Sequence, residues 1–185
     1  MLKKAQRRLH ELRQKRKDEG ASILEIIIYM GIAAFVIILV MQGGNQATDT
    51  QKINAAVTNL NTLKTSITQM FSTQRTYEGL TNEVLTASSN FPEQMRVKGD
   101  DTLIAHGWKA DGVDVVPTNI DGTDNDGFEI TMKGIPQRSC VDILDRTYRF
   151  FQEVEVNGSD VTTGIAAIRA NCADGDANDL VFRDR

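Results

Sequence analysis

The sequence contains little cysteine, proline, histidine and tryptophan. Its 185 residues include two cysteines, three prolines, two histidines and one tryptophan. A structural zinc site needs four ligands, so two cysteines without nearby histidines do not supply one. One histidine lies in the first twenty residues, which leaves His106 without a second histidine or a visible nucleophile partner. A G-x-S-x-G motif and a phosphate-binding loop are also absent, and we expect neither enzymatic activity nor a cofactor.

Long hydrophobic runs are absent with one exception. Residues Ile23–Met41 read ILEIIIYMGIAAFVIILVM and carry a single charge, Glu25. A helix of this length spans about 30 Å, the thickness of a bilayer core, so the run predicts a membrane-spanning segment. A secretory signal peptide has a shorter apolar core than this run and a small-residue cleavage site. A plain anchor leaves Glu25 unexplained, because a carboxylate near the bilayer centre costs about 2.5–3.5 kcal/mol.

The residues before the apolar run are strongly basic. Residues 1–20 carry eight Lys and Arg against three Asp and Glu, a net charge of +5. Such an asymmetry keeps the N-terminus in the cytoplasm and sends the following part across the membrane. Because the whole chain has a net charge of −4, the part after residue 20 carries about −9. An acidic exported part argues against sequence-specific nucleic-acid binding.

The stretch Gly20-Ala21-Ser22-Ile23-Leu24-Glu25 resembles the type IV prepilin signature. In that signature a basic leader ends in Gly, a peptidase cuts on the cytoplasmic side, and Glu is the fifth residue of the mature chain. The resemblance implies cleavage between Gly20 and Ala21, N-methylation of Ala21 and a role for Glu25 in filament assembly. The long leader resembles that of the type IVb subclass, which includes the toxin-coregulated and bundle-forming pilins. Ala21 is a departure, because pilins more usually begin with Phe, Met or Leu.

The resemblance implies a structural subunit of a type IVb pilus. Its partners would be identical subunits in a helical homopolymer, the prepilin peptidase and the inner-membrane assembly machinery. The subunit would cross the inner membrane once, with its N-terminus cytoplasmic and its head periplasmic, and would then enter an extracellular filament serving adhesion, aggregation or DNA transfer. A minor pilin or a type II secretion pseudopilin is an alternative, and a membrane-anchored periplasmic binding module is an alternative of another class.

A long helix is predicted over residues 21–75. Residues 21–43 would form the transmembrane part and later the filament core, and the remainder is amphipathic. Its apolar residues recur at helical spacing, which gives one buried stripe: Ile53, Ala56, Val57, Leu60, Leu63, Ile67, Met70 and Phe71. Two consecutive glycines cost about 2 kcal/mol of helix propensity, so a bend or local melting is expected at Gly43-Gly44.

Residues 76–185 are predicted to form an α+β globular head with an antiparallel sheet. About 110 residues suffice for one small domain with its own core. The chain from Arg75 to Gly112 has little periodicity and is expected to be mainly loop. Within it, Asn82–Ala87 is a candidate for a short helix. Beyond it the pattern favours the following elements: strands at Val113–Val116, Gly127–Lys133, Glu153–Val156 and Leu180–Phe182, and a helix at Pro136–Phe151 with Val141, Leu144, Tyr148 and Phe151 on one face.

The two cysteines, Cys140 and Cys172, both lie in the part expected to be exported. In an oxidising periplasm an isolated pair is most simply one disulfide. The segment from Gly127 to Leu144 also resembles the type IVb pattern of a central strand, a turn and a helix that carries the first cysteine.

Three further features are expected to be structural. Ile120–Gly127 is rich in Asp and Gly, but with Gly127 as the required glycine the first and twelfth positions of an EF-hand would be Gly122 and Lys133, so a solvated turn is favoured and no metal site is assigned. His106 is expected to be structural or at the surface, because no partner group accompanies it. Trp108 is expected in the core or in a subunit contact.

Overall fold

The computed structural model describes the backbone of residues 2–175 and 177–185, and the side chains of residues 23, 25–37, 48–175 and 177–185. The chain forms two compact units, Met1–Thr48 and Asp49–Arg185. Helix α1 spans Leu2–Met70 and contributes to both. It begins at Leu2 and so includes the predicted leader, whereas we expected it to begin at Ala21. It ends at Met70, before the expected Arg75. Both residues of Gly43-Gly44 are helical, so the local melting that we considered there does not occur.

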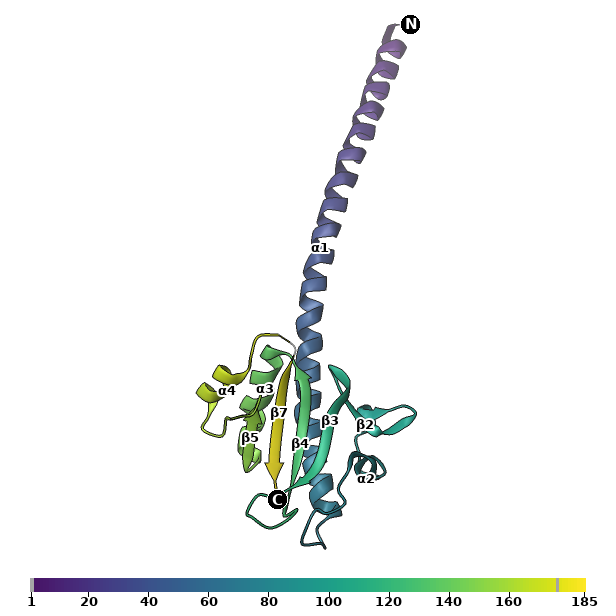
Figure 1. The fold of residues 1–185 in the computed structure, drawn as a ribbon. Helices are drawn as coiled ribbons and strands as arrows, with labels where there is room; N and C mark the ends of the chain where they lie inside the picture. The colour runs from purple at the N-terminus through teal and green to yellow at the C-terminus, as the bar shows by residue number, and fades with distance from the viewer. Residues whose placement is uncertain (1, 176) are drawn as a thin grey trace. The chain divides into compact units, whose positions relative to one another are not determined.

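The second unit is an α+β head built on one sheet of seven strands, all paired antiparallel, in the order β1-β2-β3-β4-β7-β5-β6. Figure 1 shows α1 behind β3, β4 and β7, with α3 and α4 beside β5 and α2 beside β2. The strands are β1 Arg96–Val97, β2 Asp100–His106, β3 Lys109–Thr118, β4 Gly127–Ile135, β5 Glu153–Val156, β6 Ser159–Asp160 and β7 Asn178–Asp184. The helices are α2 Asn82–Thr86, α3 Gln137–Thr147 and α4 Ile165–Asn171, and the 3₁₀ turns are η1 Glu93–Met95 and η2 Tyr148–Phe150.

The second part of α1 supplies one side of the head's core. All the apolar residues that the helical spacing selects belong to one hydrophobic cluster or pack against it. Ile53, Leu60, Leu63 and Ile67 are at most 4% exposed. Their partners are the inward positions of the sheet, which alternate with outward polar ones along each strand: Val113, Val115, Phe128, Ile130, Met132, Val154, Val156, Leu180 and Phe182.

Helix α3 covers the core beside β5, but its buried face differs from the expected one. Pro136 caps it as expected, because a proline needs no N–H partner at a helix start. The buried residues are Ser139, Cys140, Ile143, Leu144 and Thr147. Val141 and Tyr148 are only partly buried. Cys140, which is bonded to Cys172 after α4, lies on this buried face.

The largest departure from the sequence prediction lies between Arg75 and Gly112. β1 and β2 occupy a region expected to be loop, and β3 starts at Lys109 and continues through Pro117 to Thr118. A proline fits there because Val115 N–H points away from β4 and donates to Asn82 Oδ1 at 2.8 Å. Pro117 lies two residues further on, so its nitrogen lies on the same open side and interrupts no pair with β4.

The remaining predicted elements are present with small changes in length. β4 includes all of Gly127–Lys133 and runs on to Ile135, and β5 matches Glu153–Val156. Helix α4 lies in a segment to which the sequence pattern assigns no element. β7 extends the expected Leu180–Phe182 on both sides and lies between β4 and β5, an order that no single-strand pattern reveals.

Candidate assembly site and the disulfide region

Glu25 lies on an exposed face of α1 in the first unit. The hydroxyl of Tyr29, one turn along the helix, donates to Glu25 Oε1 at 3.1 Å. This contact needs no tertiary structure, because residues four apart in a helix are neighbours. It leaves the second carboxylate oxygen available to another partner.

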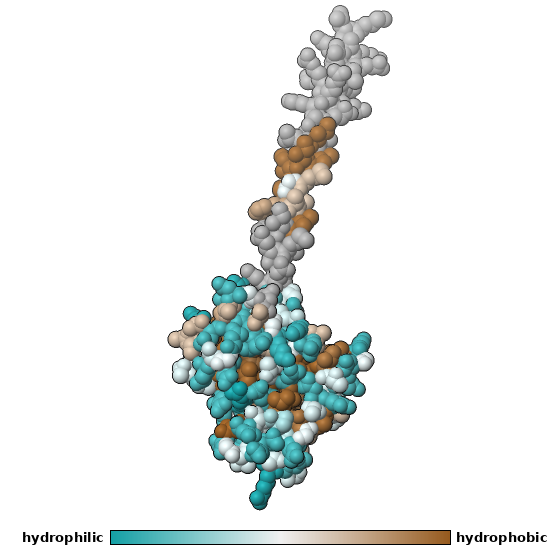
Figure 2. Space-filling model, viewed as in Figure 1, coloured by the Kyte–Doolittle hydropathy of each residue, from teal (hydrophilic) through white to brown (hydrophobic). Residues whose placement is uncertain are grey.

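Large apolar side chains surround Glu25 along this part of α1. Ten of them are 49–69% exposed: Ile23, Ile26, Ile27, Ile28, Tyr29, Met30, Ile32, Phe35, Val36 and Ile37. Figure 2 shows the segment as a mostly brown surface, whereas the viewed face of the head is largely teal. A continuous apolar surface of this kind marks contact with a membrane or another protein. Among the side chains that the structure describes, no helix offers a stretch long and apolar enough to cross a bilayer.

The predicted processing site lies where the structure gives backbone only. Gly20 and Ala21 are helical, and their side chains lie outside the described set, as do several in the predicted span 21–43, among them Leu24 and residues 38–43. Cleavage after Gly20 and N-methylation of Ala21 therefore stay predictions.

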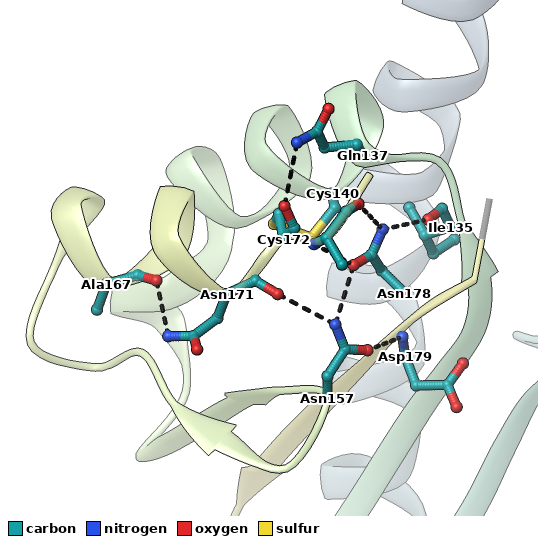
Figure 3. The surroundings of a disulfide bond; sticks show 10 residues. Ile135, Gln137, Cys140, Asn157, Ala167, Asn171, Cys172, Asn178 and Asp179 are labelled. Atoms are coloured by element: carbon teal, nitrogen blue, oxygen red, sulfur yellow. Dashed lines mark hydrogen bonds between the residues drawn. A yellow bond between two sulfur atoms is a disulfide. The ribbon is translucent and has the colours of Figure 1, made fainter. Parts of the chain in front are cut away.

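Cys140 of α3 and Cys172 after α4 form a disulfide with Cα atoms 6.0 Å apart (Figure 3). Both are at most 3% exposed. The bond closes a loop over a sequence separation of 32, which contributes about 3–4 kcal/mol in the chain-entropy account. It holds together the two helices that cover the β5 side of the head.

Asn178 anchors the chain after Cys172, a role that sequence reasoning missed. Its Nδ2 donates to the carbonyls of Ile135 and Ala173 at 3.0 Å each, and its Oδ1 accepts from Ala173 N–H at 2.8 Å. Asn157 Nδ2 donates to the same oxygen at 3.0 Å (Figure 3). A buried amide with all its hydrogen bonds made fixes these segments strongly, because removing it leaves several groups unpaired.

The Asp-rich segment Ile120–Gly127 folds around its own backbone. Asp126 accepts from Ile120 N–H at 2.7 Å and from Asp121 N–H at 3.1 Å, and these bonds lower the pKa of Asp126. Its Oδ2 also pairs with Arg185 at 3.1 Å. Within the described residues, no group of three or more His, Cys, Asp and Glu is placed to hold a metal ion.

His106 ends β2 and anchors the turn into β3. Its Nε2 lies 2.9 Å from the carbonyl of Lys133, and its Nδ1 accepts from the backbone N–H of Trp108 at 3.2 Å. These two bonds select the neutral tautomer with the proton on Nε2. Burial, followed by the charge of Lys109, lowers the pKa of His106. A Cβ at Gly112 would collide with the imidazole ring, so this position requires glycine.

Arg183 makes a cross-strand ion network that the sequence analysis did not identify. It contacts Glu129 on β4 at 2.7 Å and Glu155 on β5 at 2.6 Å, and these hydrogen bonds raise its pKa. Glu129, Arg183 and Glu153 lie opposite one another in the register. The charged residues stand at alternate positions of their strands in the sequence. Their pairing could be predicted only with the knowledge that β7 lies between β4 and β5.

Comparison with known proteins identifies a family and relatives that are similar to this chain. The PilS N-terminal family model matches residues 50–184. The toxin coregulated pilin of Vibrio cholerae serotype O1 (strain ATCC 39315 / El Tor Inaba N16961) is 28% identical over 151 residues, covering 77% of this chain and 64% of that protein. The chain thus spans less than two thirds of that curated relative.

Solved structures share the fold. The crystal structure of TcpA, a type IV pilin from the El Tor biotype of Vibrio cholerae, superposes with a TM-score of 0.55 at 15% identity, covering 73% of this chain and 99% of that one. The type IVb pilin from Salmonella typhi gives a TM-score of 0.57 at 24% identity, covering 70% and 97%. In each case the solved chain is covered almost entirely.

Proposed function

Because the chain belongs to the PilS family of type IVb pilins, we propose that it is a structural subunit of a type IVb pilus. The observation that carries the proposal is the contrast within α1. Its second part is buried by the head, whereas the residues around Glu25 present an exposed apolar surface with one carboxylate. A bundle of identical helices would bury that surface, and a lone chain in water would not.

The subunit is made as a prepilin and shortened. The basic residues 1–20 hold the N-terminus in the cytoplasm, the inner membrane receives the apolar segment 21–43, and the head lies in the periplasm. The prepilin peptidase cuts between Gly20 and Ala21, and the new amine at Ala21 is methylated. The inner-membrane machinery then adds the subunit to an extracellular filament. No catalytic step belongs to the chain itself.

Glu25 sets the register between subunits. Cleavage creates a positive amine at Ala21, and the carboxylate of Glu25 on one subunit meets the amine of a neighbour shifted along the filament axis. Each charge alone would be costly in an apolar bundle, so only registers that pair them are favourable. Tyr29 occupies one oxygen of Glu25 and leaves the other for this contact.

Electron microscopy of sheared surface filaments, combined with mass spectrometry of their subunits, tests the proposal. We expect filaments whose main component begins at Ala21 and carries one methyl group. Retention of residues 1–20, or a cut near Ala47, would refute the processing step. A chain present only in traces within filaments built from another subunit would favour a minor pilin or a type II secretion pseudopilin instead.

A further inference from the structure

A surface pocket of about 530 Å³ lies where the β2–β3 turn approaches the end of β4 and the start of β7. Pockets that hold small ligands have volumes of about 300–1,000 Å³ and combine apolar walls with a few polar groups. This pocket has both kinds of group. Its lining consists of Trp108, Lys109, Lys133, Gly134, Pro136, Ala177 and Asp179.

Trp108 forms a fixed apolar wall of this pocket. Its backbone N–H donates to His106 Nδ1, and its ring lies 5.8 Å from the imidazole ring, centroid to centroid. The ammonium group of Lys52 on α1 lies 5.9 Å from the tryptophan ring. The side chain packs against the core yet remains only partly buried. A tryptophan held by two neighbours, His106 and Lys52, loses little further freedom when a ligand contacts it.

The polar groups of the pocket differ in whether another residue already pairs with them. Lys133 pairs with Asp114, so its charge is compensated. Asp179 Oδ1 accepts from Gly134 N–H at 3.0 Å, which leaves its second oxygen for a hydroxyl donor. Lys109 is exposed, and no ion pair joins it to any side chain that the structure describes. Among the described side chains, the pocket therefore offers a lysine without an ion pair, one carboxylate oxygen and an aromatic wall.

We propose that this pocket binds a carboxylated saccharide. The C–H face of a pyranose ring packs against Trp108 and Pro136, a ring hydroxyl donates to Asp179, and the sugar carboxylate pairs with Lys109. Each contact uses a group that is open in the structure. A neutral sugar would lack a partner for Lys109, and a simple inorganic anion would leave the aromatic wall unused, so both should bind more weakly.

Tryptophan fluorescence provides a direct test, because Trp108 is the only tryptophan in the chain. Full-length subunit in detergent is titrated with 3′-sialyllactose, lactose or sodium acetate, with excitation at a wavelength that spares tyrosine. We expect a saturable change with sialyllactose and at least tenfold weaker responses to lactose and acetate. Subunits separated by detergent do not require a filament, so this test does not depend on the proposed assembly function.

Matched variants separate the pocket from general surface charge. Lys109→Gln should remove the preference for sialyllactose over lactose. Lys98→Gln should leave it unchanged, because Lys98 is exposed in the β1–β2 turn and does not line the pocket. The proposal fails if sialyllactose produces no saturable change, if lactose binds equally well, or if Lys98→Gln reduces binding as much as Lys109→Gln.

Discussion

The two parts of α1 place similar residues in opposite environments. In the first unit, large apolar side chains between Ile23 and Ile37 are 49–69% exposed, whereas in the head Ile53, Leu60, Leu63 and Ile67 are at most 4% exposed. The head part has a polar face and a sheet to cover the apolar one, and the described side chains between Ile23 and Ile37 have neither. The comparison teaches that the head can fold with its own residues, while the first part of the helix needs a partner outside the described chain.

The largest expected effect concerns that missing partner. Replacing Glu25 by Ala should abolish filaments, because the proposed pairing with the Ala21 amine is lost, while processing and head folding continue. Glu25→Asp should retain part of the assembly. Tyr29→Phe is the matched control, since it removes only the hydroxyl that donates to Glu25. Filament counts by electron microscopy measure all three, and normal numbers with Glu25→Ala would disprove the charge-register mechanism.

Two phenylalanines, one in each part of the molecule, test the comparison between the buried head and the exposed part of α1. Phe128 is fully buried and packs against Tyr77 with ring centroids 5.2 Å apart, whereas Phe35 is 62% exposed. Phe128→Ala should lower the free energy of unfolding of the head by about 3–5 kcal/mol. Phe35→Ala should leave it within about 0.5 kcal/mol. Urea unfolding of the detergent-solubilised chain measures both, and equal losses would contradict the division of roles.

The disulfide should account for a slightly smaller share of head stability. Replacing Cys140 and Cys172 together by serine should lower the free energy of unfolding by about 3–4 kcal/mol, because the unfolded chain regains the entropy of an open loop. Reduction of the native protein should have a similar effect and none on the double variant. A double variant as stable as the native protein would show that α3 and α4 are held by packing alone.

The smallest expected effect is the pH dependence due to His106. The fold lowers the pKa of His106 and so favours the neutral ring. The stabilisation that the neutral ring gives to the folded head is fully present above the unfolded pKa of about 6.5. Stability should fall as the pH drops below that value, by less than about 1.4 kcal/mol per pH unit. Carboxylates also respond to acid, so the measurement is the difference in slope between native protein and His106→Gln from pH 7 to 5. Identical slopes would refute the assignment.

The strongly periodic parts of the head could be predicted from sequence. β4 alternates apolar and polar residues, and the apolar residues of α1 recur every three or four positions, so each pattern carries its own geometry. The pairing of Cys140 with Cys172 followed from there being no other cysteine. These features depend on the local spacing of residues or on the absence of any other cysteine, and both can be read from a single sequence.

The features that escaped prediction depend on pairing between distant segments. β2 contains Asp100, Asp101 and Thr102, whose polar character conceals a strand, and it forms because β3 lies beside it. The contacts of Arg183 and Asn178 likewise require the register of β7. The wall that Trp108 gives to the pocket could not be foreseen, because Pro136 and Asp179 are brought to it by the sheet.

The position of β7 has a consequence for the order in which the head can fold during synthesis. β5 and β6 are joined to the rest of the sheet only through β7, whose residues Asn178–Asp184 come last of all the strands in the sequence. While the chain is synthesised from its N-terminus, α1 and β1–β4 can meet, but the β5–β6 pair has no strand through which to join them. The head therefore stays open along one edge until residues 178–184 have been synthesised. In that interval a competing strand from another nascent chain could occupy the vacant place.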